Sequence, residues 1–274
     1  MADPALAGLV VALPTPHGEE VTSPSSTPSA TSSTTPSTTI GVLGGMSWES
    51  TALYYRLANE LVREARGSAS PLASADLLVR SLDFAGVREL QLTDRWDEAA
   101  ELLRSEGLAL AGGGAGLVLV ATNYMHKAVG PLERALAERG ARLLHLADVV
   151  ADAALARGAR TVGLLGAGGT MTEPFYAERL AARGVDVVVP DAAGVARVDE
   201  AVFGELCAGV FSDSTRAAVA AVVADLVERG AQAVGLCCTE LELLVRPEDS
   251  PVPLLPSARL HVEAALVASG QLST

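Results

Sequence analysis

Lysine is almost absent from this chain of 274 residues: Lys127 is the only one among 20 basic residues. Enzymes that use pyridoxal phosphate need a lysine to hold the cofactor as a Schiff base. Lys127 would be the only candidate, and no phosphate-binding pattern surrounds it. The composition therefore argues against pyridoxal-phosphate chemistry.

Cysteine and histidine are scarce as well. The three cysteines are Cys207, Cys237 and Cys238, and an odd number with two adjacent does not make a disulfide framework. Free cysteines are typical of a reducing compartment, so we expect a cytoplasmic protein. The four histidines are scattered, with no zinc-type spacing to the cysteines, and we expect no metal site.

Positive charge and long apolar runs are also lacking. The net charge of −13 disfavours binding to nucleic acid and to anionic membrane surfaces, because like charges repel. No apolar run is long enough to cross a bilayer. Apolar residues nevertheless make up 49% of the chain, which suffices for a substantial core. We therefore expect a globular protein whose partner is a small molecule.

Two kinds of sequence follow one another along the chain. Residues 20–38 are rich in Ser, Thr and Pro, so residues 1–38 are predicted to form a disordered leader. From Thr39 onward, short apolar runs alternate with amphipathic stretches, which is typical of an α/β fold with parallel sheets. The predicted strands are 39–43, 76–81, 116–121, 142–146, 160–165, 185–189, 232–237 and 252–255. The predicted helices include 49–66, 95–112, 147–157, 173–183, 198–208 and 214–229.

The α/β region contains an internal repeat. Thr39–Ser47 resembles Thr161–Met171, and Gly116–Asn123 resembles Ala233–Glu240 at a similar spacing. The repeat predicts two pseudo-symmetric halves, each a small parallel sheet flanked by helices. In such sheets ligands bind beyond the carboxyl ends of the strands, so the site is expected between the halves.

Cys238 is the principal candidate for chemistry. It ends a predicted strand and precedes a helical turn, and a helix N-terminus stabilises a thiolate. Adjacent residues of a strand face opposite sides, so Cys237 is expected in the core and Cys238 in the cleft. Cys207 lies in a helical apolar stripe and is expected in the core. In the repeat alignment, the counterpart of Cys238 is Ala121.

Three motifs together resemble the aspartate/glutamate racemase family. They are Ile40–Thr51, Ala121–Lys127 and Cys238–Val245, and the similarity runs in register over about 40–270. The resemblance implies a cofactor-independent amino-acid racemase, a homodimer, with two Rossmann-like lobes and a cysteine from each lobe beside the substrate Cα. The lobes would be 39–145 together with the C-terminal segment 253–274, and 146–252.

The resemblance also implies site residues. Ala121 occupies the position of the family's first cysteine and cannot transfer a proton, so Thr122, Tyr124, His126 or a bound water would have to replace it. The expected substrate-binding residues are Met46, Ser47, Thr122, Asn123, Thr170, Arg197 and Thr239. Arg197 stands where some relatives place a cation for the distal carboxylate; a solvated arginine on a helix face is the alternative.

The expected function is racemisation or epimerisation of aspartate- or glutamate-type amino acids. Replacing Ala121 with cysteine is then expected to raise activity. One alternative is a one-thiol decarboxylase or isomerase, since arylmalonate decarboxylases are similar in keeping only the second cysteine. Another is a non-catalytic homologue that binds an amino acid or dicarboxylate.

Overall fold

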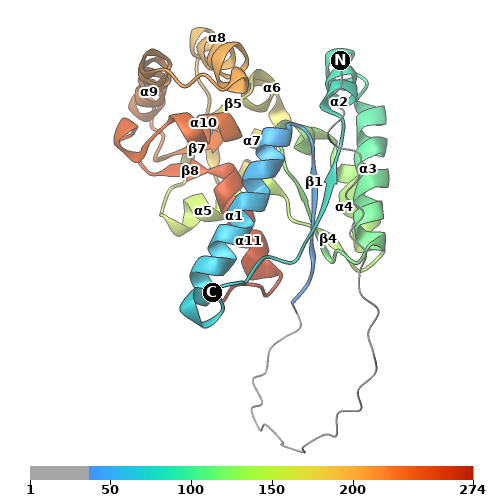
Figure 1. The fold of residues 1–274 in the computed structure, drawn as a ribbon. Coiled ribbons are helices and arrows are strands. Elements are labelled where there is room, and N and C mark those ends of the chain that lie inside the picture. The colour runs from blue at the N-terminus through green and yellow to red at the C-terminus, as the bar shows by residue number, and fades with distance from the viewer. Residues whose placement is uncertain (1–36, 274) are drawn as a thin grey trace, which may run out of the picture. The chain divides into compact units, whose positions relative to one another are not determined.

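The computed structural model describes residues 37–273, so nearly all of the predicted leader lies outside the described residues. Two four-stranded sheets form the centre of two lobes (Figure 1). Their strand orders are β2-β1-β3-β4 and β6-β5-β7-β8, and every pairing is parallel. This confirms the predicted α/β fold with its repeated sheets.

Each segment predicted to be a strand contains or overlaps one. The first sheet comprises β1 (Ile40–Gly44), β2 (Leu77–Ser81), β3 (Leu117–Val120) and β4 (Arg142–Leu143). The second comprises β5 (Thr161–Gly166), β6 (Asp186–Val188), β7 (Ala233–Cys237) and β8 (Leu254–Pro256). The central strands β1, β3, β5 and β7 are almost entirely buried, which explains why they read as continuous apolar runs.

Helices connect the strands and cover the sheets. They are α1 (Trp48–Arg66), α2 (Phe84–Leu92), α3 (Trp96–Gly112), α4 (Gly130–Ala137), α5 (Leu146–Ala156), α6 (Gly168–Thr172), α7 (Pro174–Ala181), α8 (Ala192–Glu200), α9 (Asp213–Glu228), α10 (Thr239–Leu244) and α11 (Ser257–Ala268). Short 3-10 turns span Gly67–Ala69, Tyr124–Ala128, Leu206–Ala208 and Pro247–Asp249, and a π-helical turn spans Ala201–Glu205. None of the helices within residues 37–273 has the length and apolarity needed to cross a membrane.

Local sequence sets where several helices begin and end. The Ser47 hydroxyl accepts a hydrogen bond from the backbone of Ser50 at the start of α1, and Ser212 caps α9 in the same way. Just beyond the ends of α5 and α9, Gly158 and Gly230 have φ angles of 73° and 99°, which favour glycine.

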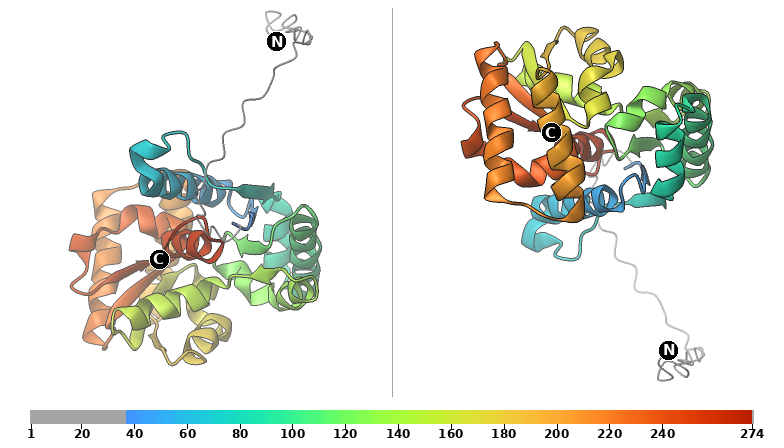
Figure 2. Two further views of the ribbon diagram at one scale, coloured as in Figure 1. Left: turned by 90° about the horizontal axis from the view of Figure 1, so that it is seen from below. Right: turned by 90° about the horizontal axis from the view of Figure 1, so that it is seen from above.

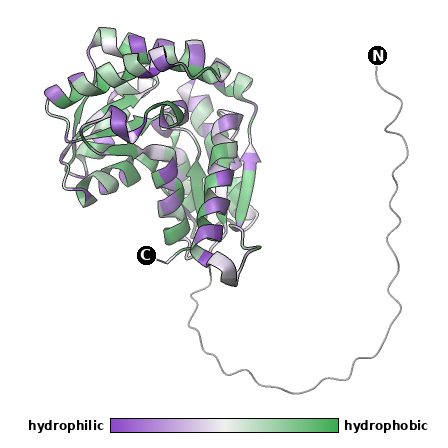
Figure 3. Cartoon of the chain, turned by 60° about the vertical axis from the view of Figure 1, so that its left-hand side comes forward, coloured by the Kyte–Doolittle hydropathy of each residue, from purple (hydrophilic) through white to green (hydrophobic). Residues whose placement is uncertain are grey.

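The two faces of the first sheet pack into different cores. Val118 and Val120 of β3 face α3 and α4, whereas Leu117 and Leu119 face α1 and α11. Figure 3 shows the resulting concentration of hydrophobic residues along the inner strands. The alternation of side chains along β3 therefore also decides whether a residue just after the strand faces the core.

The C-terminal segment contributes a strand to the second lobe and a helix to the first. α11 lies between α1 and α5 and covers one face of the first sheet (Figure 2). β8, however, pairs with β7 in the second sheet, which corrects the expectation that the whole of 253–274 belongs to the first lobe. The hydrogen bonds of a parallel ladder hold β8 beside β7, and only the helix crosses to the first lobe.

Candidate active site

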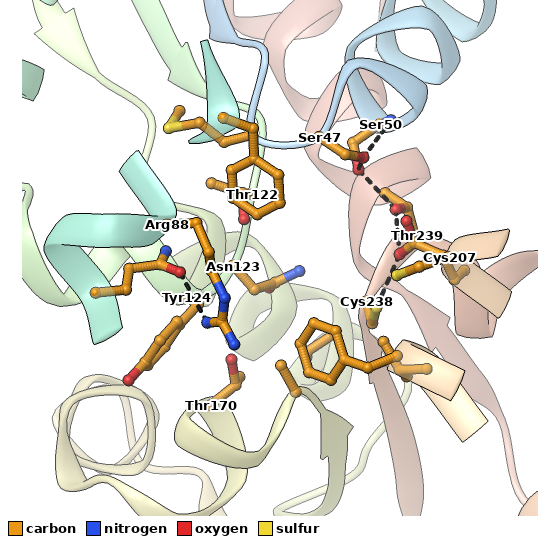
Figure 4. A pocket seen from close by; sticks show the side chains of 18 residues that line it. Ser47, Ser50, Arg88, Thr122, Asn123, Tyr124, Thr170, Cys207, Cys238 and Thr239 are labelled. Carbon is orange, nitrogen blue, oxygen red and sulfur yellow. Dashed lines mark hydrogen bonds between the residues drawn. The ribbon is translucent and has the colours of Figure 1, made fainter. Parts of the chain in front are cut away.

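The carboxyl ends of the central strands open onto one pocket of about 650 Å³, part of it open to solvent (Figure 4). Its lining combines residues of both lobes: Met46, Ser47, Ser50, Phe84, Arg88, Gln91, Thr122, Asn123, Tyr124, Ala167, Thr170, Val202, Phe203, Cys207, Cys237, Cys238, Thr239 and Glu240. Most of the predicted site residues are therefore brought together. Ala121, His126 and Arg197 are not among them.

The strand register corrects the internal alignment. Leu43 of β1 pairs with Val120 of β3. At the same place in the second repeat, Leu165 of β5 pairs with Leu236 of β7. Val120 and Leu236 are therefore equivalent, and the alignment made from the sequence was shifted by one residue.

Two residues further along, Thr122 and Cys238 occupy equivalent positions, and Ala121 is equivalent to Cys237. Burial agrees, because Ala121 and Cys237 are only 0% and 2% exposed and pack into the cores. Thr122 and Cys238 are half-buried and line the pocket. The expectation that Ala121 faces Cys238 is thus wrong, since a slip of one residue turns a side chain to the other face of the sheet.

The surroundings of Cys238 favour the protonated thiol over the thiolate. Its Sγ–H donates to Oε2 of Glu240 at 2.9 Å. Burial is the largest cause that raises the pKa of this thiol well above its ordinary value, and the Glu240 carboxylate raises it further. The backbone N–H of Glu240 at the start of α10 lowers the pKa, but this helix-end effect is the weaker one.

Glu240 also ends a chain of hydroxyls that crosses between the lobes. Thr239 Oγ1 donates a hydrogen bond to Glu240 Oε2 at 2.8 Å. The same Thr239 Oγ1 lies 2.7 Å from Ser50 Oγ. Ser50 Oγ in turn lies 3.2 Å from Ser47 Oγ. Since the single Thr239 proton goes to the carboxylate, Ser50 must donate to Thr239. Sequence reasoning missed the role of Glu240, although its place two residues after Cys238 was the available signal.

Asn123 is largely committed to the protein itself. Its Nδ2 donates to Ser257 Oγ at 3.0 Å, and its Oδ1 accepts from the Tyr176 hydroxyl at 3.0 Å. Both partners lie on other elements, α11 and α7. One N–H of the Asn123 amide remains to face the pocket.

His126 lies outside the pocket lining, so the expected role in proton transfer is corrected. Its Nδ1 lies 2.8 Å from the Thr122 carbonyl oxygen, and its Nε2 accepts from the Leu146 backbone N–H at 3.2 Å. Nδ1 must therefore carry the proton. Burial lowers the pKa of His126 to about 4, which keeps the ring neutral.

Three buried histidines form a cluster beneath the site. The ring centre of His126 lies 4.6 Å from that of His145 and 6.1 Å from that of His261. Burial lowers the pKa of His261 to about 3, and His261 bridges the Tyr54 hydroxyl and the Leu144 carbonyl. Burial therefore favours the neutral form of these rings.

We therefore expect acid to destabilise the fold through His261. Its folded pKa lies below the unfolded value of about 6.5, so its contribution is complete above that pH and is lost as the pH falls toward 3. His261→Gln keeps both a donor and an acceptor but does not titrate. Urea unfolding between pH 7 and pH 4 should show a shallower loss of stability in the variant, by up to about 1.4 kcal/mol per pH unit. Parallel pH profiles for the two proteins would contradict this.

Tyr124 does not serve as a base. Its hydroxyl donates to Glu173 Oε1 at 2.6 Å, and burial followed by this carboxylate raises the pKa of Tyr124 far above 10. A Cβ on Gly169 would lie 2.3 Å from the Tyr124 ring, so the glycine makes room for the aromatic side chain.

Lys127 lies outside the pocket lining. Its Nζ pairs with the same Glu173 carboxylate at 2.5 Å and lies 4.0 Å from the ring centre of Trp96.

Comparison with known proteins decides the family. A model of the Asp/Glu/hydantoin racemase family matches residues 43–265. The chain belongs to this family. It is 36% identical to a candidate Asp/Glu racemase from Yersinia pestis. The superposition with that structure spans 85% of this chain and 99% of the Yersinia chain, with a TM-score of 0.78.

Two further solved structures have the same architecture. An aspartate racemase homologue from Pyrococcus horikoshii is 28% identical, with a TM-score of 0.74 over 85% of this chain and 99% of the other. An aspartate racemase from Picrophilus torridus shares the fold at 16% identity, with a TM-score of 0.62 over 85% and 94% of the two chains. The resemblance seen in the sequence motifs is confirmed.

This racemase-family protein departs from two other expectations. Arg197 lies exposed on α8, outside the pocket lining, whereas Arg88 of α2, which sequence reasoning missed, reaches into the pocket. Cys207 is exposed and lines the pocket instead of the core. The predicted helix 198–208 breaks into α8, a π-helical turn and a 3-10 turn, so a 3.6-residue period could not place Cys207.

Proposed function

We propose that this protein is a cofactor-independent racemase or epimerase of aspartate- or glutamate-type amino acids. Cys238 and Thr122 would exchange protons with Cα from opposite sides. The observation that carries the proposal is the equivalence of these two residues, one from each lobe, at the ends of β7 and β3 on a shared pocket. Inversion requires a proton acceptor and a proton donor on opposite faces of one carbon.

The proton transfers balance within the site. Glu240 takes the proton of the Cys238 thiol, and the resulting thiolate takes the proton from Cα, so that an S–H bond replaces the C–H bond. The Thr122 hydroxyl then gives its proton to the other face of Cα and becomes an alkoxide. Glu240 releases its proton to solvent, and solvent reprotonates Thr122.

The direct test is proton NMR of aspartate, glutamate and a wider set of amino acids in D₂O with the purified protein. Loss of the α-proton signal together with loss of optical activity is expected for at least one acidic amino acid. If neither change occurs with any amino acid at high enzyme concentration, the racemase proposal fails. Binding without exchange would favour a non-catalytic homologue.

Glu240→Gln is expected to lower the exchange rate at pH 7 by about 100-fold, because the thiol loses its proton acceptor. The variant also lacks the charge that raises the pKa of Cys238, so part of the activity should return at alkaline pH, where the thiol ionises unaided. Rates measured from pH 6 to pH 10 provide the check. A loss that is equal at every pH would indicate a structural role for Glu240 and contradict the assignment.

One observation favours a second candidate. A protonated thiol is the form required to deliver a proton to one face of a planar enediolate, and Cys238 is in this form. A decarboxylase or one-sided isomerase needs only one such donor. Release of CO₂ from substituted malonates, without racemisation of any amino acid, would favour this reaction.

A further inference from the structure

A line of hydrogen bonds behind the pocket ends on a carboxylate that the proposed reaction leaves unused. Cys237 Sγ–H donates to the Tyr176 hydroxyl at 3.3 Å, and this hydroxyl donates to Asn123 Oδ1 at 3.0 Å. Asn123 Nδ2 donates to Ser257 Oγ at 3.0 Å, and the Ser257 hydroxyl donates to Glu242 Oε1 at 3.1 Å. The line therefore links Glu242, which lies outside the pocket lining, to Asn123, which belongs to it.

The middle of this line has little access to water. Tyr176 and Ser257 are 0% exposed, and Asn123 is 6% exposed. A buried polar atom that loses its partner cannot readily take water instead, so the loss costs free energy. Each residue in the line consequently depends on the next one for its hydrogen bond.

The carboxylate at the end sets the direction of the bonds. Glu242 Oε1 can only accept, and it also accepts from the Ala258 backbone N–H at 2.6 Å. The Ser257 hydroxyl proton therefore goes to Glu242, which leaves the Ser257 oxygen to accept from Asn123. Only the NH₂ end of the Asn123 amide can donate, so Nδ2 faces Ser257 and Oδ1 faces the Tyr176 hydroxyl.

The orientation of the Asn123 amide decides what this part of the pocket offers to a ligand. Nδ2 carries a second N–H besides the one that goes to Ser257. In Figure 4 this nitrogen points toward Cys238 and Thr239. A carboxylate bonded to a carbon beside Cys238 would meet an N–H donor there, whereas a reversed amide would present an oxygen and repel it.

We propose that Glu242, acting through Ser257, is a positioning residue that orients the Asn123 amide toward the carboxylate next to the reacting carbon. Neither Glu242 nor Ser257 belongs to the pocket lining. Glu242 instead borders a separate hollow between α1, α10, β8 and α11. The reaction at Cα rests on the proposed function, whereas the orientation of Asn123 does not.

Hydrogen exchange of the Asn123 side-chain amide, followed by ¹⁵N NMR of the full chain, tests the orientation without any ligand. Asn123→Ala identifies the signals by their loss. Ser257→Ala removes the acceptor of Nδ2 but keeps the bond from the Ala258 backbone to Glu242, so the start of α11 stays anchored. We expect the amide protons to exchange about tenfold faster in Ser257→Ala.

Further variants test the role of the acceptor oxygen. Glu242→Leu should speed the exchange as much as Ser257→Ala does, and the double variant should be no faster, because both changes act through one amide. Glu242→Gln keeps a carbonyl oxygen and should stay within about threefold of the unaltered protein. Ser269→Ala is the matched control, because Ser269 is 3% exposed at the other end of α11 and donates to the Leu266 carbonyl. It should leave the exchange unchanged.

Binding and turnover of aspartate and glutamate give the functional measurement. An oriented donor holds the ground state and the transition state alike, so Ser257→Ala and Glu242→Leu should raise Kd and KM about tenfold and leave kcat nearly unchanged. Glu242→Gln and Ser269→Ala should stay within about twofold of the unaltered protein. A lower kcat at an unchanged KM would indicate a merely structural role and contradict the proposal. Melting temperatures establish that each variant is folded.

The outcomes separate the two proposals. If the Asn123 amide exchanges equally slowly in Ser257→Ala and Ser269→Ala, the positioning role is overturned. If its exchange rises and aspartate or glutamate binds more weakly, but no amino acid exchanges its α-proton, the positioning role stands and the racemase proposal falls. If Ser257→Ala racemises an acidic amino acid with an unchanged KM, the positioning role falls and the racemase proposal stands. Absence of binding of both acids to the unaltered protein overturns the assignment to a ligand carboxylate.

Discussion

Cys238→Ala is expected to lower α-proton exchange by about 1000-fold or more. A methyl group cannot take or give a proton, and general acid–base groups contribute about 100- to 10,000-fold to such rates. Of the other two thiols in the pocket lining, Cys237 is 2% exposed and donates to the Tyr176 hydroxyl, and Cys207 lies on a separate 3-10 turn, so only Cys238 contacts Glu240. Loss of the α-proton signal of aspartate in D₂O, followed by NMR, measures the effect.

Cys207→Ala is the matched control. Cys207 also lines the pocket, but it lies on a 3-10 turn of the second lobe and has no hydrogen bond to a carboxylate among the described residues. We expect this variant to retain more than a third of the rate. If Cys238→Ala keeps more than a tenth of the exchange rate, Cys238 is not the proton-transfer group.

Thr122→Ala is expected to separate exchange from racemisation. Without the hydroxyl opposite Cys238, the α-proton is still removed and returned from the Cys238 side, so exchange should stay within about tenfold of the original rate. Inversion should fall by about 1000-fold, because no group donates to the other face. Parallel measurement of deuterium uptake and optical rotation distinguishes the two reactions.

Substitutions by cysteine test the corrected register. Thr122→Cys places a thiol in the position equivalent to Cys238 and should sustain or raise racemisation. Ala121→Cys, which the sequence alignment favoured, should give no gain, because Ala121 is fully buried against Leu117 and Leu119. The larger side chain should instead destabilise the core by about 1–3 kcal/mol. Higher activity in Ala121→Cys than in Thr122→Cys would refute the register argument.

Much of the fold was predictable because the responsible signals are local. Short apolar runs marked the strands, and the paired Gly-rich and Cys-containing segments revealed the duplication. Alternation along a strand correctly predicted that Cys237 packs into the core, at 2% exposed, and that Cys238 reaches the pocket, although Cys237 also touches the pocket lining. The motifs also identified the family.

The interpretation failed where contacts between distant segments decide the outcome. The alignment that paired Ala121 with Cys238 compared apolar strands, and apolar runs tolerate a shift of one residue with little loss of similarity. Only the ladder between neighbouring strands fixes the register. Arg88 could not be distinguished from other helix arginines, because its place in the pocket depends on how α2 packs beside the second lobe.

By itself, then, the sequence determined the repeated α/β architecture and the family, since each depends on periodicity or on a short motif. The tertiary structure alone decided that Thr122 and Cys238 occupy equivalent positions in the two sheets, that the Cys238 thiol contacts Glu240, and that His126 belongs to a buried cluster. These three features arise from side chains and strands brought together by folding. Their electrostatic and packing energies depend on distances that a linear pattern does not contain.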